Sequence, residues 1–208
     1  MSSTEFASAD LTAGQLNAIV KKLGGHDMAL RFLRDELSVS EPTRSWREVD
    51  GVIYFTAVSD GTTGEEWIAR LEGGGFRIGD YAKSVLRSPD FKPTTGVTTE
   101  IAVLKGALFT DDERITEKIR AEADRRTLLT PNAELALLIR EKFTDKEVEA
   151  MGLIWIVTMH DPIKDSVGGP FLLSVGRGGV GRWLNACRGR PASWWLRAYG
   201  FAFAVSQV

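Results

Sequence analysis

Apolar residues near the start of the sequence recur at helical spacing and predict two short helices. The Gly24-Gly25 turn separates them, and Thr12 begins a capping box for the first helix. Arg31 and Arg34 lie on the second helix, so the pair could in principle read DNA as a helix-turn-helix. The segment is not strongly basic, however, and a simple helical hairpin is the favoured interpretation.

The next stretch mixes strand and helix periodicity. Residues 52–58 are β-branched and aromatic and predict a strand, which is followed by an amphipathic helix that ends at the glycines of 73–75. These glycines are not a phosphate-binding loop, because no Gly-Lys-Ser/Thr follows them. A short strand at 76–78 and a further helix lead to the Pro- and Gly-containing loop 88–96, which predicts a domain boundary between residues 95 and 96.

Beyond that loop the pattern changes to one strand, then helices, then several strands. Residues 97–104 predict a strand, Asp111 or Asp112 opens a charged helix, and Thr130-Pro131 opens an apolar one. Thr144 begins a second capping box, for a short helix. Four strands joined by Gly-rich loops are expected at 154–160, 171–175, 182–186 and 200–205. This order is typical of an α+β fold and not of alternating βαβ units.

Composition narrows the class of protein but does not identify an activity. The chain has 208 residues, a net charge of −2 and one cysteine, so it can bury a core, forms no internal disulfide and has no general attraction for nucleic acid or anionic membranes. The first residues lack the basic and apolar regions of a secretory signal, and no apolar run is long enough to span a membrane. We therefore expect a cytoplasmic protein by default, with surface display by another route left open.

The stretch from Gly181 to Val208 contains two unlike sets of residues. An apolar frame is interleaved with a mixed set that follows no helical or strand period and has the composition of an antibody paratope, rigid rings among small polar groups. The frame comprises Arg182, Trp183, Leu184, Ala186, Pro191, Trp195, Gly200, Phe201 and Phe203. The mixed set comprises Asn185, Cys187, Arg188, Gly189, Arg190, Ala192, Ser193, Trp194, Leu196, Arg197, Ala198 and Tyr199. The run GFAFAV at its end predicts a buried closing strand.

Two small groups of residues could carry chemistry. His160 beside Asp161 could be a general base at a strand end, but no nucleophile accompanies it, and a turn-forming role is the favoured interpretation. Asp161 and Asp165 lack the further oxygen ligands of a calcium loop, and zinc lacks a Cys/His set. Cys187 lies next to Arg188, which could lower the pKa of its thiol, but it has no evident base. We therefore expect no catalytic residue, no metal and no cofactor.

The order Ala186, Pro191, Trp195 and Gly200-Phe201 resembles the C-terminal signature of C-type-lectin-like domains of the formylglycine-generating-enzyme type. In particular it is similar to the variable proteins of diversity-generating retroelements. In such systems a reverse transcriptase copies a template repeat with adenine-specific errors, and the copy replaces the end of the target gene. The alternative within this resemblance is a bacterial family to which no activity is assigned.

The resemblance implies a fold and a function. Residues 96–208 would form a C-type-lectin-like ligand-binding domain of two helices and a mainly antiparallel sheet, preceded by a small mixed helical and strand domain, residues 1–95, of unknown role. The frame residues would be the invariant scaffold, and the mixed set would be the diversified binding face. The protein would then be a non-enzymatic display or recognition protein whose partner is an unknown protein or other macromolecule.

Two other classes of function stay open. The chain could be an enzyme, a hydrolase or oxidase using His160 and Asp161 or Cys187, although a formylglycine-generating oxidase should have a pair of active-site thiols. It could also be a nucleic-acid-associated module, since Arg182, Arg188, Arg190 and Arg197 alternate with aromatic residues. The slightly negative net charge argues against nucleic acid.

Overall fold

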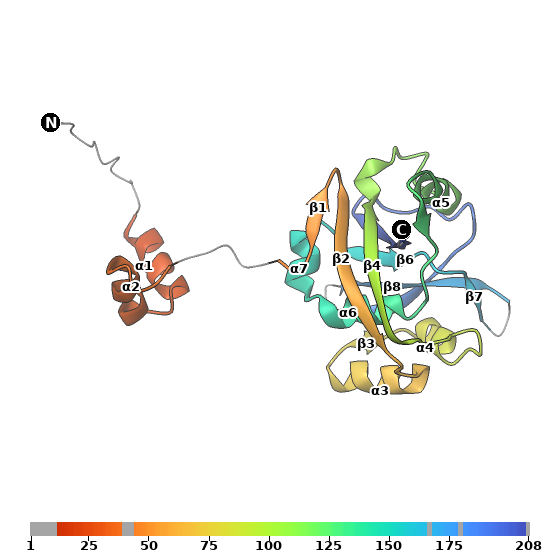
Figure 1. Cartoon of the computed structure of the whole chain (residues 1–208), viewed down its shortest axis with the longest axis horizontal. Coiled ribbons are helices and arrows are strands. Elements are labelled where there is room, and N and C mark those ends of the chain that lie inside the picture. The colour runs from red at the N-terminus through yellow and green to blue at the C-terminus, as the bar shows by residue number, and fades with distance from the viewer. Residues whose placement is uncertain (1–11, 39–43, 166–167, 179–180, 207–208) are drawn as a thin grey trace. The chain divides into compact units, whose positions relative to one another are not determined.

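The computed structural model describes residues 12–38, 44–165, 168–178 and 181–206 (Figure 1). The chain divides into two compact units, Met1–Arg44 and Ser45–Val208. The boundary expected between residues 95 and 96 falls inside the second unit. The reason is the sheet: strand β2 (Val52–Asp60) lies before that boundary and pairs along its length with strand β4 (Thr95–Lys105), which Figure 1 shows beside it.

The first unit contains the predicted helical hairpin. Helix α1 spans Ala13–Lys22 and helix α2 spans His26–Leu33. Thr12 and Gln15 exchange both bonds of the predicted capping box. Within the two helices only Ala29 is buried, so these described helices bury little of their apolar surface.

The second unit is built on one mixed sheet. Its strands follow the order β1-β2-β4-β10-β6-β8-β9-β3, with β5 paired to β10 and β7 paired to β8. The remaining strands are β1 (Arg47–Val49), β3 (Arg77–Ile78), β5 (Leu128–Leu129), β6 (Trp155–Thr158), β7 (Ile163–Lys164), β8 (Pro170–Gly178), β9 (Gly181–Arg188) and β10 (Tyr199–Val205). Across the described residues there are seven α-helices and ten strands, mostly antiparallel, so the α+β prediction is confirmed.

Strand β10 joins the two halves of this sheet. It runs antiparallel to β4 on one side and parallel to β6 on the other. Phe201 is completely buried, as expected for the closing strand, because β10 lies in the middle of the sheet and has neighbours on both sides.

Apolar side chains on the two faces of the sheet form two separate clusters. On one face Ile53, Ile101 and Val175 pack with four helices. On the other, Val157, Leu172 and Phe203 pack with helix α5 and with Trp195. The helices are α3 (Gly64–Gly73), α4 (Asp80–Leu86), α6 (Leu135–Lys142) and α7 (Asp145–Ala150) on the first face and α5 (Thr116–Arg125) on the second; a 3-10 turn spans Gly106–Leu108.

Two predicted helix starts were wrong. Helix α6 begins at Leu135 and not at Thr130-Pro131, because the segment before it forms a turn in which the Glu134 amide donates to the Asn132 side chain. Helix α5 begins at Thr116 and not at Asp111 or Asp112. Ile115 has extended backbone angles and forms a β-bridge with Trp194, which delays the helix. In the described residues, no helix is long and apolar enough to cross a bilayer.

Candidate functional site

The loop between β9 and β10, residues 189–198, is fastened to the start of helix α5 by main-chain hydrogen bonds. The Trp195 amide donates to the Arg114 carbonyl at 3.0 Å, and the amides of Thr116 and Glu117 donate to the Ser193 and Pro191 carbonyls at 3.0 Å each. Ordered bonds of this kind fix the course of a loop that has no regular structure of its own. Loop 189–198 is therefore a defined surface.

Buried side chains support the loop from beneath. The Trp195 ring is 4% exposed and packs against Tyr199 and Phe201, and its indole N–H donates to the Thr116 hydroxyl at 3.0 Å. Arg114 is 2% exposed and donates to the carbonyls of Gly106 and Phe109, and its guanidinium pairs with Asp111. A paired and hydrogen-bonded buried charge of this kind holds adjacent segments in place.

The outer side chains of the loop are open to solvent. Trp194 is 57% exposed and Leu196 is 42% exposed. The Trp194 indole N–H donates to the Asp111 carbonyl at 3.1 Å, so the ring is oriented even though it is exposed. The residues of the expected binding face that are exposed are Arg188, Arg190, Ala192, Trp194, Leu196 and Arg197; Asn185, Cys187, Ser193, Ala198 and Tyr199 are half-buried.

One residue assigned to the variable face does not fit it. Gly189 is buried, and a Cβ added there would lie 2.6 Å from Cγ of Leu172, so no larger residue fits without displacing that side chain. Cys187 projects toward the buried cluster on the α5 face and not out of the loop.

The expected scaffold is likewise only partly interior. The buried members are Leu184, Trp195, Gly200, Phe201 and Phe203, the half-buried ones are Arg182, Trp183 and Ala186, and Pro191 is exposed. The frame therefore depends mainly on its five buried residues, while Pro191 contributes through its carbonyl, which accepts from the Glu117 amide.

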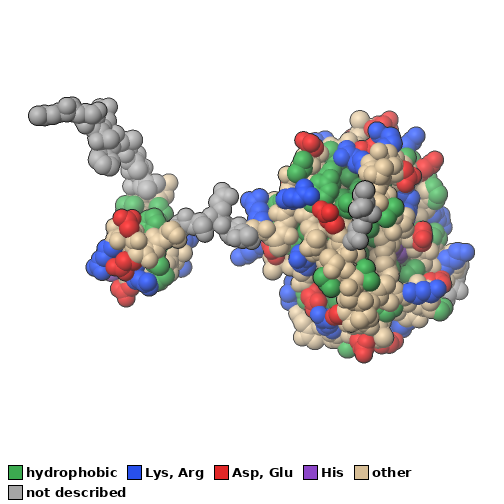
Figure 2. Space-filling model, in the orientation of Figure 1, with side chains coloured by type: hydrophobic (Ala, Val, Ile, Leu, Met, Phe, Trp, Pro, Cys, Tyr) green, Lys and Arg blue, Asp and Glu red, His purple; other side chains and the backbone are tan. Residues whose placement is uncertain are grey.

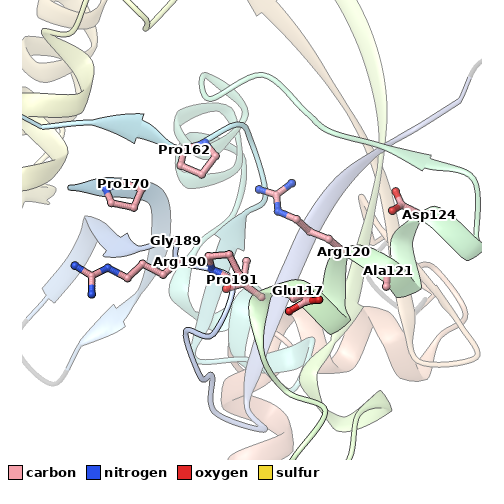
Figure 3. A pocket seen from close by; sticks show the side chains of 10 residues that line it. Glu117, Arg120, Ala121, Asp124, Pro162, Pro170, Gly189, Arg190 and Pro191 are labelled. Atoms are coloured by element: carbon pink, nitrogen blue, oxygen red, sulfur yellow. The ribbon is translucent and has the colours of Figure 1, made fainter. Parts of the chain in front are cut away.

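A cavity of about 550 Å³ opens beside the loop (Figure 3). Helix α5 forms one wall, Pro162 and Pro170 form another, and residues 189–191 close the third side. In Figure 3 the Arg120 side chain extends from α5 toward Pro162, while Arg190 points away from the helix. The cavity is lined mainly by hydrocarbon with a few charged groups, the usual character of a ligand pocket.

Arg120 is the charged group most closely tied to this cavity. Its guanidinium donates to the His160 carbonyl at 2.7 Å. Burial lowers the pKa of Arg120, while the carboxylates of Asp161 and Asp124 act in the opposite direction. Arginine stays protonated under these conditions, so the cavity has a fixed positive charge that is partly screened by neighbouring carboxylates.

His160 has a structural environment. It is 1% exposed, its Nε2 accepts the Leu173 amide at 2.9 Å, and its Nδ1 lies 2.7 Å from the Asp161 carbonyl. Burial lowers the pKa of His160 from 6.5 to about 4. The ring stays neutral near pH 7, but both of its nitrogens already have hydrogen-bond partners. His160 therefore has no free nitrogen with which to accept a proton as a general base.

Cys187 has no activating neighbour in the structure. Its Sγ lies 3.3 Å from the Ser174 hydroxyl, and burial raises the pKa of the thiol. A protonated thiol is a poor nucleophile. Among the described residues, no group of three or more His, Cys, Asp or Glu side chains is placed to hold a metal ion.

Three residues of this region were missed from the sequence. Arg114, Ile115 and Arg120 belong to a charged stretch that predicts only a helix opened by Asp111 or Asp112. That pattern indicates neither the burial of Arg114, whose side chain bonds to the carbonyls of Gly106 and Phe109, nor the bridge of Ile115 with Trp194, which lies far along the chain.

Comparisons of this chain with protein-family models, with curated proteins and with solved structures give no match. Its function is therefore argued from its own geometry.

Proposed function

We propose that this protein is a non-enzymatic binding protein that recognises a macromolecular ligand through the exposed side chains of loop 189–198. The observation that carries the proposal is the contrast between Trp194 and Trp195. One ring is open to solvent and oriented, and its neighbour is buried and supports the loop. A rigid frame that presents exposed aromatic and Arg side chains is the usual form of a protein recognition surface.

The cavity beside α5 adds a recess to this surface. It opens next to Arg190 and Pro191, so a ligand lying over the loop would reach it. A recess next to exposed anchors suits the insertion of a side chain from the partner. The enzyme alternatives have less support, because burial favours the uncharged form of both the His160 ring and the half-buried Cys187 thiol.

A library experiment tests whether the surface and the frame are separable. Five exposed positions, Arg188, Arg190, Trp194, Leu196 and Arg197, are randomised together and the variants are displayed on phage. Most members should stay folded, as judged by protease resistance, and selection on a purified model protein should yield binders. The matched library randomises Gly189, Trp195 and Phe201 and should lose protease resistance. Equal loss in both libraries would contradict the proposal.

The proposal also assigns the domain to a fold family and names a genetic mechanism that varies its exposed surface. The second unit, residues 45–208, would correspond to a C-type-lectin-like domain that includes β2 as well as the expected residues 96–208, and its exposed loop positions would be diversified by a retroelement. Gly189 is excluded from that set. The support is the closing strand β10, which returns the loop to the sheet beside a fixed frame. The DNA around the gene tests this part: a near-copy of the coding end that differs at adenines, with a reverse-transcriptase gene nearby, is expected. Without both, the surface would be fixed and not diversified.

A further inference from the structure

A row of aromatic side chains crosses the sheet at a place separate from the loop anchors. The strand register places Tyr199 of β10 beside Trp155 of β6, and Trp155 beside Gly176 of β8. Gly176 in turn lies beside Trp183 of β9, and Trp183 beside Arg77 of β3. Residues paired in this way project from the same face of a sheet. We call these five residues the aromatic row.

The row is flat because Gly176 has no side chain. A Cβ built on Gly176 would lie 2.5 Å from Cε3 of Trp155, so the Trp155 indole lies across the position that a side chain would otherwise take. The absence of a side chain at Gly176 therefore makes room for the Trp155 ring to lie across β8. At the far end, the Arg77 guanidinium lies 5.5 Å from the centre of the Trp183 ring.

The aromatic row lies where the buried part of this sheet face ends. In the next row of the same face, Phe201, Val157 and Ser174 are completely buried. Trp155, Trp183 and Tyr199 are only half-buried. Half-buried aromatic side chains at the end of a covered sheet face leave part of their apolar surface available to a ligand.

Apart from the Arg77 guanidinium, the polar groups of the row and beside it are neutral hydrogen-bonding groups. In the described part of the chain, the indole N–H groups of Trp155 and Trp183 have no hydrogen-bond partner. The same holds for the Tyr199 hydroxyl and for the side-chain nitrogen of Asn185, which follows Trp183 on the same face of β9. The surface thus combines half-buried aromatic rings with neutral groups at their edges and one guanidinium at its end.

We propose that the aromatic row binds a neutral glycan chain. A pyranose ring has one C–H-rich face and a rim of hydroxyls, and the negative face of an aromatic ring attracts such C–H groups. The strand spacing of about 4.8 Å is close to the length of one sugar residue in an extended chain, so successive sugars can lie over successive strands. The neutral donors at the ring edges match the sugar hydroxyls.

Single-stranded nucleic acid fits the row less well. Bases also stack on aromatic rings, but the phosphate backbone needs a positively charged groove. Arg77 is the one charged residue in the row and its guanidinium lies over Trp183. On the face shown in Figure 2, cationic and anionic side chains are interspersed over the second unit. A single guanidinium at one end of the row is not such a groove, so the row favours a neutral ligand.

Calorimetric titration of the full-length protein with cellohexaose, chitohexaose and laminarihexaose tests the proposal. At least one hexasaccharide should bind, and its trisaccharide should bind more weakly because it covers fewer rings. Trp155→Ala and Trp183→Ala should each weaken binding by roughly tenfold, the change expected for loss of one aromatic contact, whereas Trp183→Phe should stay within roughly threefold.

Two controls keep the result interpretable. The first is the thermal unfolding midpoint of each variant, which separates loss of binding from loss of folding. The second is saturation-transfer NMR on the unmodified protein, which should show contact between aromatic protons and sugar C–H protons even if an alanine variant unfolds. The proposal is overturned if no hexasaccharide binds, if both alanine variants bind normally, or if oligodeoxythymidylate binds the row more tightly than every glycan. Trp194→Ala should leave glycan binding unchanged, so failure here is distinct from failure of the loop 189–198 surface.

Discussion

Adjacent tryptophans with opposite environments define the site at the scale of single residues. Replacing Trp194 by Ala should change the free energy of unfolding by no more than about 0.5 kcal/mol, because the ring is mostly in water. Replacing Trp195 by Ala should cost about 3–5 kcal/mol, because a buried ring leaves a cavity. Urea unfolding followed by circular dichroism measures both. A larger loss for Trp194→Ala would reverse the assignment of frame and surface.

The buried imidazole of His160 predicts a dependence of stability on pH. Its folded pKa of about 4 lies below the ordinary 6.5, so between these values the unfolded chain binds a proton that the folded chain does not. The contribution of His160 should be complete above pH 6.5 and decrease as the pH falls to 4, by on the order of 3 kcal/mol in total.

Denaturant titrations between pH 7 and pH 4 measure this slope. Arg120, whose charge acts on the ring, stays protonated through this window. His160→Gln retains an acceptor for the Leu173 amide without titrating, and its stability should vary less with pH. An identical slope in the two proteins would show that other groups are responsible.

At the scale of helices and strands, the features that the sequence predicted correctly are those that interactions between neighbouring residues determine. The capping boxes at Thr12 and Thr144 form as expected, since each uses residues three apart. The strands at 52–58 and 200–205 were found because they are apolar along their whole length. The starts of α5 and α6 were wrong, since contacts with residues distant in sequence decide them.

The surface of the proposed binding site was predicted in part. Trp194, Leu196 and Arg197 are exposed, whereas Trp195 and Phe201 are buried, in agreement with the division of the stretch into a mixed set and a frame. That division depended on the order of the residues and on the resemblance that this order carries. The aromatic row was missed, because Trp155 belongs to an apolar strand pattern and becomes a neighbour of Trp183 only through the register of three strands.

Two glycines, one in a tightly packed environment and one in an open environment, give a matched test of side-chain packing. Gly189→Ala should destabilise the protein by about 1–3 kcal/mol, because its Cβ would overlap the Leu172 side chain. At Gly73, in the last turn of α3, a Cβ would meet nothing within 4 Å. Gly73→Ala should be neutral or slightly stabilising. Thermal melts of the two variants make the comparison, and similar midpoints would place residue 189 in an open environment.

At the scale of the whole molecule, the pairing of β2 with β4 determines where the chain can be cut. A fragment of residues 45–208 should melt cooperatively, at a temperature close to that of the full chain. A fragment of residues 96–208 should not fold, because β4 would lose β2, the one of its two partners that pairs along its whole length. Calorimetry of the two fragments measures whether each unfolds cooperatively. A cooperative transition in the fragment 96–208 would support a domain boundary at residue 95.

The central place of β10 also constrains how the protein is made. Strand β10 is synthesised after the other described strands of the sheet. Until it is made, the strands β1-β2-β4 and the strands β6-β8-β9 are not joined, and the edges of β4 and β6 that pair with β10 stay unpaired. Such edges invite pairing with other chains. Nascent or prematurely terminated protein should therefore need a chaperone more than the finished protein does, and any exchange of the coding end must deliver an intact β10 along with whatever loop it brings.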